Sequence, residues 1–314
     1  MQRYDVVIVG GGPAGLTAAM ALSRSLRRVL VAEAPEPPRN AASPGVHGVV
    51  GLDGVSPAEY RRRAWADLDR YGMAERREAT VTDVTPVPEG GFAVTLTETE
   101  TGTGTGTGTE TDADADAGEP VWARQVLLTT GMVDVHPDVE GFAECWGKTI
   151  IHCPFCAGWE NRDRTWGVVT DDPEFARKAA TGFCAWSRDV IVLFDGTVPE
   201  ECREAEVVEG RIRRLRHTGG YLYAVELADG TVVARQTLLW QLAQRPVPLV
   251  SRLAERLGLA VGEDGYVKVD GTGRTSVPGL YAAGDLTTEA QGAIEAAAAG
   301  SAAAFQMISE VPAV

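Results

Sequence analysis

The stretch "DVVIVGGGPAG" (residues 5–15) decides the fold of this chain. Its apolar part, residues 5–9, predicts a buried parallel strand, and the glycines that follow open a helical stretch, "LTAAMALSRSL". A second apolar run, "RRVLVAEAP", ends at Glu33, eighteen positions after Gly15. Strand, glycine turn, helix and strand in this order predict a βαβ unit that binds a dinucleotide.

Each residue of this turn has a physical task. Gly10 allows the tight turn, Gly12 lets the backbone approach a pyrophosphate, and Gly15 lets the helix pack closely on the strand. The helix N-terminus offers N–H groups and positive potential to phosphates. Glu33 stands where an acid can accept hydrogen bonds from a ribose diol.

Size and charge exclude several other classes of protein. The 314 residues carry a net charge of −15, which argues against a nucleic-acid partner. No apolar run reaches the roughly 18 residues that a membrane span requires, and the N-terminus lacks a signal-peptide pattern. We therefore expect a cytoplasmic protein with no membrane partner.

The rest of the chain predicts a second nucleotide-binding domain inserted in the first. Strand and helix patterns resume near residue 149, and the C-terminal part returns to the first domain with "TSVPGLYAAGDL" and an alanine-rich helix. The expected class is α/β, with two Rossmann-like, three-layer domains. We predict one domain from residues 1–133 and 246–314, and an inserted domain from residues 134–245.

Three further segments carry local expectations. Residues 35–59, rich in Pro, Gly and Asn, predict a long loop near the cofactor, and residues 57–72 predict a helix. The acidic, low-complexity residues 97–118 cannot form a core and predict an extended hairpin or a mobile loop without function.

The inserted domain carries the segment "HCPFCAGWE" (152–160), with Cys153 and Cys156 two residues apart. A CxxC in a cytosolic protein indicates redox chemistry or zinc, but zinc needs four ligands. Only one such pair exists, and the four histidines show no ligand spacing, so we expect a redox pair and no metal. The other cysteines are expected to be buried apolar residues: Cys145, Cys184 and Cys202.

The whole pattern resembles the low-molecular-weight thioredoxin reductase family of flavoproteins. The resemblance rests on "GGGPAG", on "TSVPGLYAAGD", and on a CxxC that lies twenty-two residues after Gly131. It implies FAD, an inserted domain similar to an NADPH domain, and a homodimer. The segment "CPFCAGWENRD" is closer to one branch, the dithiol oxidases that close disulfides in natural products of the gliotoxin and holomycin type, and in particular to the holomycin-type bacterial enzymes.

This resemblance implies a set of site residues. Cys153 would face the substrate and Cys156 the flavin, while Asp285 would bind the ribityl chain and the helix start at residues 291–293 would meet the flavin pyrimidine. The FAD contacts implied in full are Gly10, Gly12, Pro13, Ala14, Gly15, Glu33, Ala34, Gly131, Gly284, Asp285, Gln291, Gly292 and Ala293. A helix start at the pyrimidine would stabilise negative charge on the reduced flavin.

The inserted domain's own turn argues against NADPH. The turn reads Thr170-Asp171-Asp172-Pro173-Glu174, with no glycine and with three carboxylates where a pyrophosphate would bind. The next strand is followed by "LFDGTVPEE", which offers acids where the 2′-phosphate needs arginines. The turn therefore favours an oxidase over a reductase, and the resemblance implies a dithiol oxidase that acts on a small-molecule dithiol, with O2 as acceptor and H2O2 as product, in antibiotic biosynthesis or self-resistance.

Two alternatives and the identity of the base stay open at this point. An NADPH-dependent reductase of thioredoxin would require a working turn at Asp171-Asp172, and a flavin-binding redox sensor would show no turnover. Ala157 stands where the family has an acid or a histidine. His152, next to Cys153, is the first candidate for the base, and Glu160 is the second.

Overall fold

The computed structural model describes residues 1–98, 118, 120–197 and 206–310, and they divide into two compact units. Unit 1 comprises residues 1–38, 58–133 and 245–314, and unit 2 comprises residues 39–57 and 134–244. The greater part of the predicted low-complexity loop (97–118) lies outside the described residues. The predicted α/β class is confirmed in both units.

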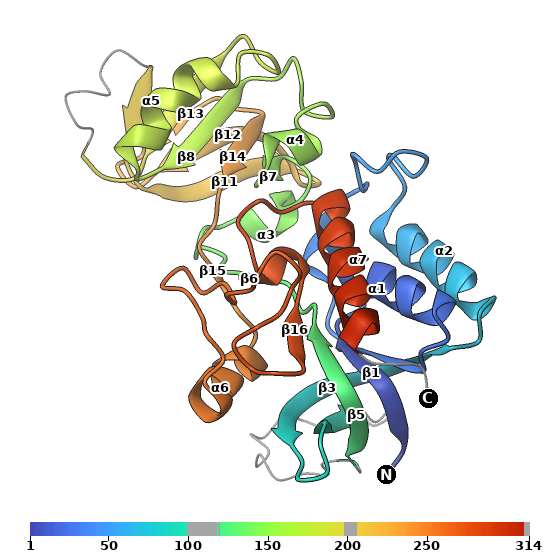
Figure 1. Ribbon diagram of the computed structural model, residues 1–314. Coiled ribbons are helices and arrows are strands. Elements are labelled where there is room, and N and C mark those ends of the chain that lie inside the picture. Colours follow the sequence, from blue (N-terminus) through green and yellow to red (C-terminus); the bar gives the residue numbers. More distant parts are fainter. Residues whose placement is uncertain (99–117, 119, 198–205, 311–314) are drawn as a thin grey trace, which may run out of the picture. The chain divides into compact units, whose positions relative to one another are not determined.

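Unit 1 is built on a sheet that joins parallel strands to an antiparallel meander (Figure 1). The parallel strands run in the order β3, β2, β1, β5 and β16. The second half of the long strand β3 pairs antiparallel with β4, which also pairs with β5. The bounds are β1 Arg3–Val9, β2 Val29–Glu33, β3 Ala74–Pro86, β4 Phe92–Glu98, β5 Val121–Leu128 and β16 Leu280–Ala282.

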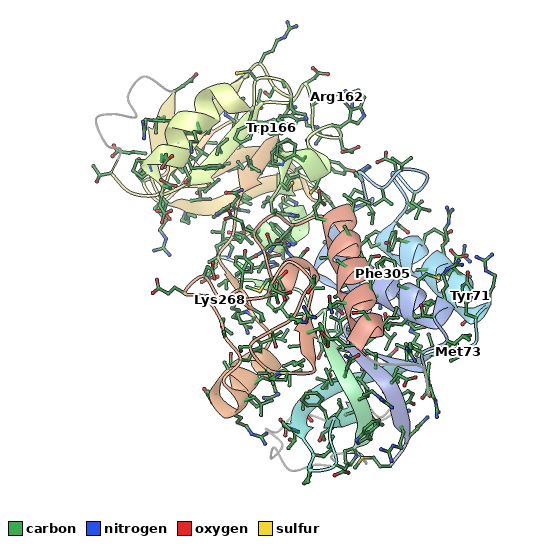
Figure 2. The ribbon with its side chains drawn as sticks, viewed as in Figure 1. Tyr71, Met73, Arg162, Trp166, Lys268 and Phe305 are labelled. Carbon is green, nitrogen blue, oxygen red and sulfur yellow. The ribbon has the colours of Figure 1, made fainter. Side chains whose placement is uncertain are left out.

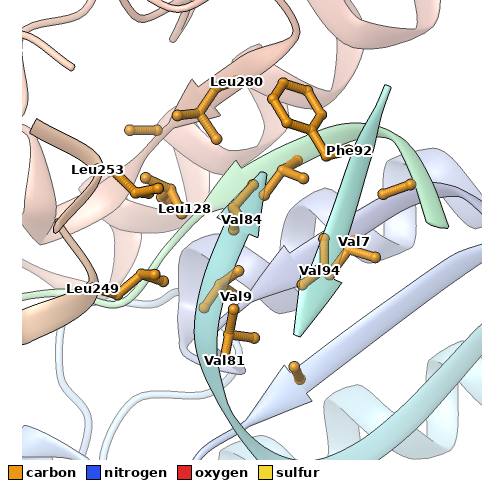
Figure 3. Packing of buried hydrophobic residues seen from close by; sticks show 14 of the residues in the cluster. Val7, Val9, Val81, Val84, Phe92, Val94, Leu128, Leu249, Leu253 and Leu280 are labelled. Atoms are coloured by element: carbon orange, nitrogen blue, oxygen red, sulfur yellow. The ribbon is translucent and has the colours of Figure 1, made fainter. Parts of the chain in front are cut away.

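Helices cover one face of this sheet and the meander covers the other. The helices α1 (Pro13–Arg24) and α7 (Ala293–Glu310) pack side by side, and α2 (Pro57–Asp69) contributes Trp65 and Leu68 to the same core. On the opposite face, apolar residues of the sheet, the meander and α6 (Pro248–Leu257) form a second core (Figure 3). The strands β2 and β16 are buried along their whole length and β1 and β5 at their carboxyl ends, as their apolar sequences predict, whereas β3 is largely exposed on one face.

Unit 2 contains a parallel sheet and a separate, smaller antiparallel sheet. Its five parallel strands run in the order β10, β9, β8, β14 and β7, and a three-stranded antiparallel sheet, β11–β12–β13, shares a core with them. The strands are β7 Ile150–Ile151, β8 Trp166–Thr170, β9 Val190–Phe194, β10 Val207–Glu209, β11 Ile212–Thr218, β12 Tyr221–Leu227, β13 Val232–Val233 and β14 Thr237–Trp240. The helices are α3 (Phe142–Cys145), α4 (Pro154–Ala157) and α5 (Pro173–Gly182).

The short strands β6 (Val133–Asp134) and β15 (Gln244–Arg245) pair where the chain passes from one unit to the other. The stretch 39–57 lies within the predicted loop of residues 35–59 and groups with unit 2, and the place of this loop near the cofactor stays a prediction. We call it the 39–57 loop. The 3-10 turn η1 (Arg39–Ala42) begins this loop, and an ion pair of 2.7 Å joins Arg39 to Asp134 of the same unit.

Candidate functional site

The glycine turn of unit 1 requires glycine at Gly10 and Gly15. Gly10 has a φ of +110°, its N–H donates to the Ala32 carbonyl at 2.8 Å, and a Cβ there would lie 2.5 Å from the Thr129 oxygen. A Cβ on Gly15 would lie 2.0 Å from the Gly10 oxygen. Backbone therefore packs directly on backbone at both positions, which a larger residue would prevent.

Gly12 has a different role. It is the N-cap of α1 with ordinary extended angles (φ −81°, ψ −175°), and no described atom lies within 4 Å of its virtual Cβ. Pro13 follows at the first helical position, and Ala14 is buried against Gly284 and Gly300. The N-terminus of α1 thus has no capping side chain and leaves space for an anionic group, as at other dinucleotide sites.

Thr129 supports this turn and was not predicted from the sequence. Its hydroxyl lies 2.8 Å from the Gly10 oxygen and 3.0 Å from the Val9 oxygen, so it holds the end of β1 against the end of β5. Gly131 follows with a φ of +63°, and its virtual Cβ has no described neighbour within 4 Å. The only sequence signal for Thr129 was its place between a buried strand and that glycine.

Glu33 is buried at the end of β2 and already holds two arginines. Its carboxylate accepts from Arg61 Nη2 at 2.9 Å and from Arg76 Nε at 2.6 Å, and it lies against Gly11. The arginines come from α2 and β3, so the sequence did not reveal them. A carboxylate has about four acceptor positions, which leaves room for the predicted ribose contact beside these two bonds. Ala34, the next predicted contact, is exposed.

The second FAD motif lies near the start of α7. Asp285 lies in the 3-10 turn η3 (Gly284–Leu286), and the Gln291 side chain lies 3.4 Å from the Asp285 carbonyl. A virtual Cβ on Gly292 would lie 2.1 Å from a Glu295 carboxylate oxygen. An acid therefore lies beside the helix start at Ala293, where we expected positive potential alone.

In unit 2, residues 152–162 form the redox segment. Cys153 is the N-cap of the single turn α4, which contains Cys156, and both cysteines are half-buried. The path stays helical through Gly158, where a Cβ would lie 2.3 Å from the Pro154 oxygen and 2.9 Å from the Trp186 ring. Glycine at 158 therefore lets the turn press against this tryptophan. The neighbours Phe155 and Trp159 are exposed.

A buried amide, Asn161, holds the redox segment on the sheet and was not predicted as a site residue. Its Nδ2 donates to the Ala157 carbonyl at 3.0 Å, and its Oδ1 accepts from the Thr237 hydroxyl at 3.1 Å. The indole N–H of Trp166 donates to the Asn161 carbonyl at 2.9 Å. In Figure 2 Trp166 lies inside the unit, whereas Arg162 lies at its surface.

His152 is largely buried and lies beside an aromatic ring. Its ring centroid is 6.0 Å from that of Trp146, and burial, with a smaller contribution from Arg39, lowers the pKa of His152 to about 4. The imidazole is therefore neutral at pH 7 and can accept a proton. It is a weak base for a thiol, whose ordinary pKa of about 8.5 lies more than four units higher. His152 remains a prediction as the base.

The other cysteines differ from one another. Cys145 is buried as predicted, and burial raises the pKa of its thiol. Cys184 is exposed, so that prediction was wrong: it follows α5 at the surface, where no core covers it. Cys202 lies outside the described residues.

The turn between β8 and α5 is closed by its own side chain. Asp172 is the N-cap of α5, and its carboxylate accepts the Glu174 N–H at 2.8 Å. Glu174 pairs with Lys178 at 2.7 Å, and this hydrogen bond lowers the pKa of Glu174. The acidic stretch after β9 that we compared with a 2′-phosphate site lies partly outside the described residues.

Comparison with known proteins defines the class. The chain belongs to the pyridine nucleotide-disulphide oxidoreductase family, whose model matches residues 4–169 and 204–304. The predicted resemblance to thioredoxin reductase-like flavoproteins with two Rossmann-like domains is confirmed, and members of this kind use FAD.

Particular relatives extend over almost the whole chain. Thioredoxin reductase tcpT of Claviceps purpurea is 30% identical over 298 residues, which cover 90% of this chain and 86% of the relative. Thioredoxin reductase sirT of Leptosphaeria maculans is 29% identical over 323 residues, with coverages of 95% and 91%. The crystal structure of HlmI superposes with a TM-score of 0.81 at 32% identity, and the match covers 97% of this chain and 91% of HlmI.

The residues present in unit 1 fit FAD. Gly12 leaves space at an uncapped helix N-terminus, Gly131 faces open space, and the Glu33 carboxylate retains acceptor capacity. These residues would hold the pyrophosphate and the ribose. No helix of the described residues is long and apolar enough to cross a membrane. Within the same residues, no group of three His, Cys, Asp or Glu side chains could hold a metal ion.

Proposed function

We propose that this protein is an FAD-dependent dithiol oxidase that closes an intramolecular disulfide in a small-molecule dithiol. The observation that carries the proposal is the Asp172 cap on α5. An N-terminal carboxylate satisfies the amide that a pyrophosphate would need and adds negative charge at the same place. NADPH binding is therefore disfavoured, and the electrons must enter from the dithiol.

Thiol–disulfide exchange at the redox segment supplies the chemistry. A substrate thiolate attacks Cys153 of the Cys153–Cys156 disulfide, so that a mixed disulfide forms and Cys156 leaves as a thiolate. The second substrate thiolate then attacks the substrate sulfur of this mixed disulfide. The cyclic disulfide is released, and both enzyme cysteines are left reduced with the two electrons of the substrate. FAD, when bound, supplies a two-electron acceptor that O2 can reoxidise with release of H2O2.

The surroundings of the cysteines support a small apolar substrate. Phe155 is 84% exposed and Trp159 is 66% exposed, and both lie within three residues of a redox cysteine. Aromatic faces of this kind offer contact area to a compact organic dithiol. We further propose a cytoplasmic homodimer, with a role in making a disulfide-containing antibiotic or in protecting the host from its reduced form.

The family name supports a second candidate, an NADPH-dependent disulfide reductase. The fungal relatives tcpT and sirT are named thioredoxin reductases. That activity requires hydride delivery at a turn which Asp172 closes.

Anaerobic flavin absorbance separates the two candidates. We expect a cyclisable dithiol to bleach the flavin within seconds, and air to restore the colour with one H2O2 per dithiol. The Cys153→Ser and Cys156→Ser variants should bind FAD normally and show no bleaching by dithiol. Rapid bleaching of the wild type by NADPH, with none by dithiols, would establish the reductase instead.

A further inference from the structure

His47 lies between two carboxylates and connects the 39–57 loop to the redox segment. Its Nε2 lies 3.5 Å from Glu160 Oε1, and its Nδ1 lies 3.5 Å from Asp53 Oδ1. All three residues belong to unit 2. The His47 side chain is 18% exposed. The imidazole is therefore largely enclosed, although the loop that carries it contains little regular secondary structure.

The loop is shaped around this imidazole. The Val46 N–H donates to the Val55 carbonyl at 2.7 Å, which brings the two sides of the loop together. A virtual Cβ on Gly45 would lie 2.9 Å from His47 Nε2, so the ring occupies space that only glycine leaves. The Gly48 N–H donates to Asp53 at 2.9 Å, and this bond, with a smaller contribution from His47, lowers the pKa of Asp53.

In the contact between His47 and Glu160, Glu160 belongs to the segment that buried hydrogen bonds hold in place. It follows Cys156 by four residues along a path that remains helical at Gly158, about one turn of helix. The next residue, Asn161, is the buried amide that fixes the redox segment to β14. Contact with Glu160 therefore ties the loop to a segment whose own position is set by buried hydrogen bonds.

Further contacts lie at the start of the 39–57 loop. Arg39 pairs with Asp134 at 2.7 Å, and the Ala42 backbone lies so close to Gly147 that a Cβ there would be 2.8 Å from it. The loop is thus attached to unit 2 near residue 40 and again at His47. The second attachment is the one that reaches the redox segment.

We propose that His47 is a positioning residue of the dithiol site, which holds the 39–57 loop against the redox segment through Glu160 so that the loop forms one wall of the dithiol-binding surface. This inference rests on the proposed function for the identity of the substrate. The charged groups that face His47 in the described residues are Asp53 from its own loop and Glu160 from the redox segment. Each ring nitrogen of His47 lies beside one of these carboxylates, so the imidazole links the loop to the redox segment.

The test combines hydrogen exchange with steady-state kinetics on the FAD-loaded enzyme. In His47→Ala we expect amide exchange of residues 45–55 to rise at least about threefold, and KM for a small dithiol such as dithiothreitol to rise about fivefold at pH 6, the size of a lost half-buried ion pair, with kcat little changed. Glu160→Gln should reproduce the effect, and the double variant should be no worse than either single variant.

Two further variants keep the result interpretable. His47→Gln retains a donor toward Glu160 and should recover part of the loss. His217→Ala removes a histidine of β11 in the same unit and should leave both readouts unchanged. A His47→Ala enzyme with wild-type exchange, or with faster exchange and wild-type KM, overturns the inference. Should the wild type show no dithiol-driven bleaching, the oxidase proposal fails, while hydrogen exchange still decides whether His47 fixes the loop.

Discussion

Both units contain a strand, a turn and a helix in succession, but the two helices differ at the N-terminus. A side chain caps the helix in unit 2 and none caps it in unit 1. In unit 1 the turn after β1 ends in Gly12 and Pro13, and in unit 2 the turn after β8 ends in Asp172 and Pro173. Both N-cap residues have extended backbone angles. The first has no side chain and leaves its amides to a ligand, whereas the second supplies its own carboxylate to the Glu174 N–H.

We infer from this difference that the side chain at the N-cap helps to decide whether a helix N-terminus of this architecture can accept a nucleotide phosphate. An aspartate is a better N-cap than glycine for helix stability, but it competes with a phosphate for the same amides. In unit 2 the buried side chain of Asn161 instead forms hydrogen bonds within the redox segment and to β14. Exchanging the two N-cap residues tests whether this difference decides nucleotide binding.

The largest effect is expected when the cap of unit 2 is placed in unit 1. Gly12→Asp should lower FAD affinity at least about 100-fold, because a carboxylate would lie beside the pyrophosphate. The apoprotein should be as stable as the wild type or slightly more so, since an N-cap is gained. Bound flavin per chain and thermal melting of the apoprotein are the two measurements.

Gly12→Ala is the matched control. The virtual Cβ meets no described atom within 4 Å and the backbone angles are ordinary, so the fold should be unchanged and FAD retention higher than in Gly12→Asp. Equal flavin contents in the two variants would show that charge does not matter at this position.

Loss of the amide that fixes the redox segment should come next. Asn161→Ala leaves the Thr237 hydroxyl and the Ala157 carbonyl without their partner and should cost about 2 kcal/mol of unfolding free energy. Urea unfolding measures the change. Thr237→Val, which removes one of these bonds, should cost less, and a double variant that matches Asn161→Ala alone would confirm that the two side chains form one network. A full sum of the two single effects would contradict it.

The burial of His152 predicts a pH dependence of stability. Its pKa is about 4 in the folded state against an ordinary value of 6.5, so the unfolded chain binds the proton first. Stability should be full well above pH 6.5 and should fall by about 2 kcal/mol as pH decreases to 5. His152→Phe should remove this part of the slope in unfolding experiments at several pH values. An unchanged slope would show that the imidazole is not buried as neutral.

The smallest effect is expected for the reverse exchange. Asp172→Ala should cost about 1 kcal/mol of stability, because α5 loses its cap, and Asp172→Gly somewhat less. NADPH should still bleach the flavin slowly in Asp172→Gly, because Asp171 and Glu174 remain at the turn. Rapid bleaching by NADPH in this variant would show that the cap alone closes the site.

Local patterns in the sequence predicted much of the fold. Apolar runs and the glycines between them located β1 and β2, and the Pro57 helix start was confirmed. Contacts that depend on tertiary packing could not be predicted in this way. The 39–57 loop has no apolar period, so its attachment to unit 2 by Arg39 and His47 could not be read from the chain.

The features of the candidate site also fall into a local group, which the sequence predicts, and a group that depends on tertiary contacts. Covalent spacing and backbone conformation are local, so the sequence by itself determined the glycine turn, the CxxC pair and the closed turn at Asp172. Contacts between distant segments depend on how the elements pack. Only the tertiary structure decided that Arg61 and Arg76 bind Glu33, that Trp146 lies beside His152, and that His47 meets Glu160, because each of these contacts joins residues at least six, and mostly more than twenty-five, positions apart.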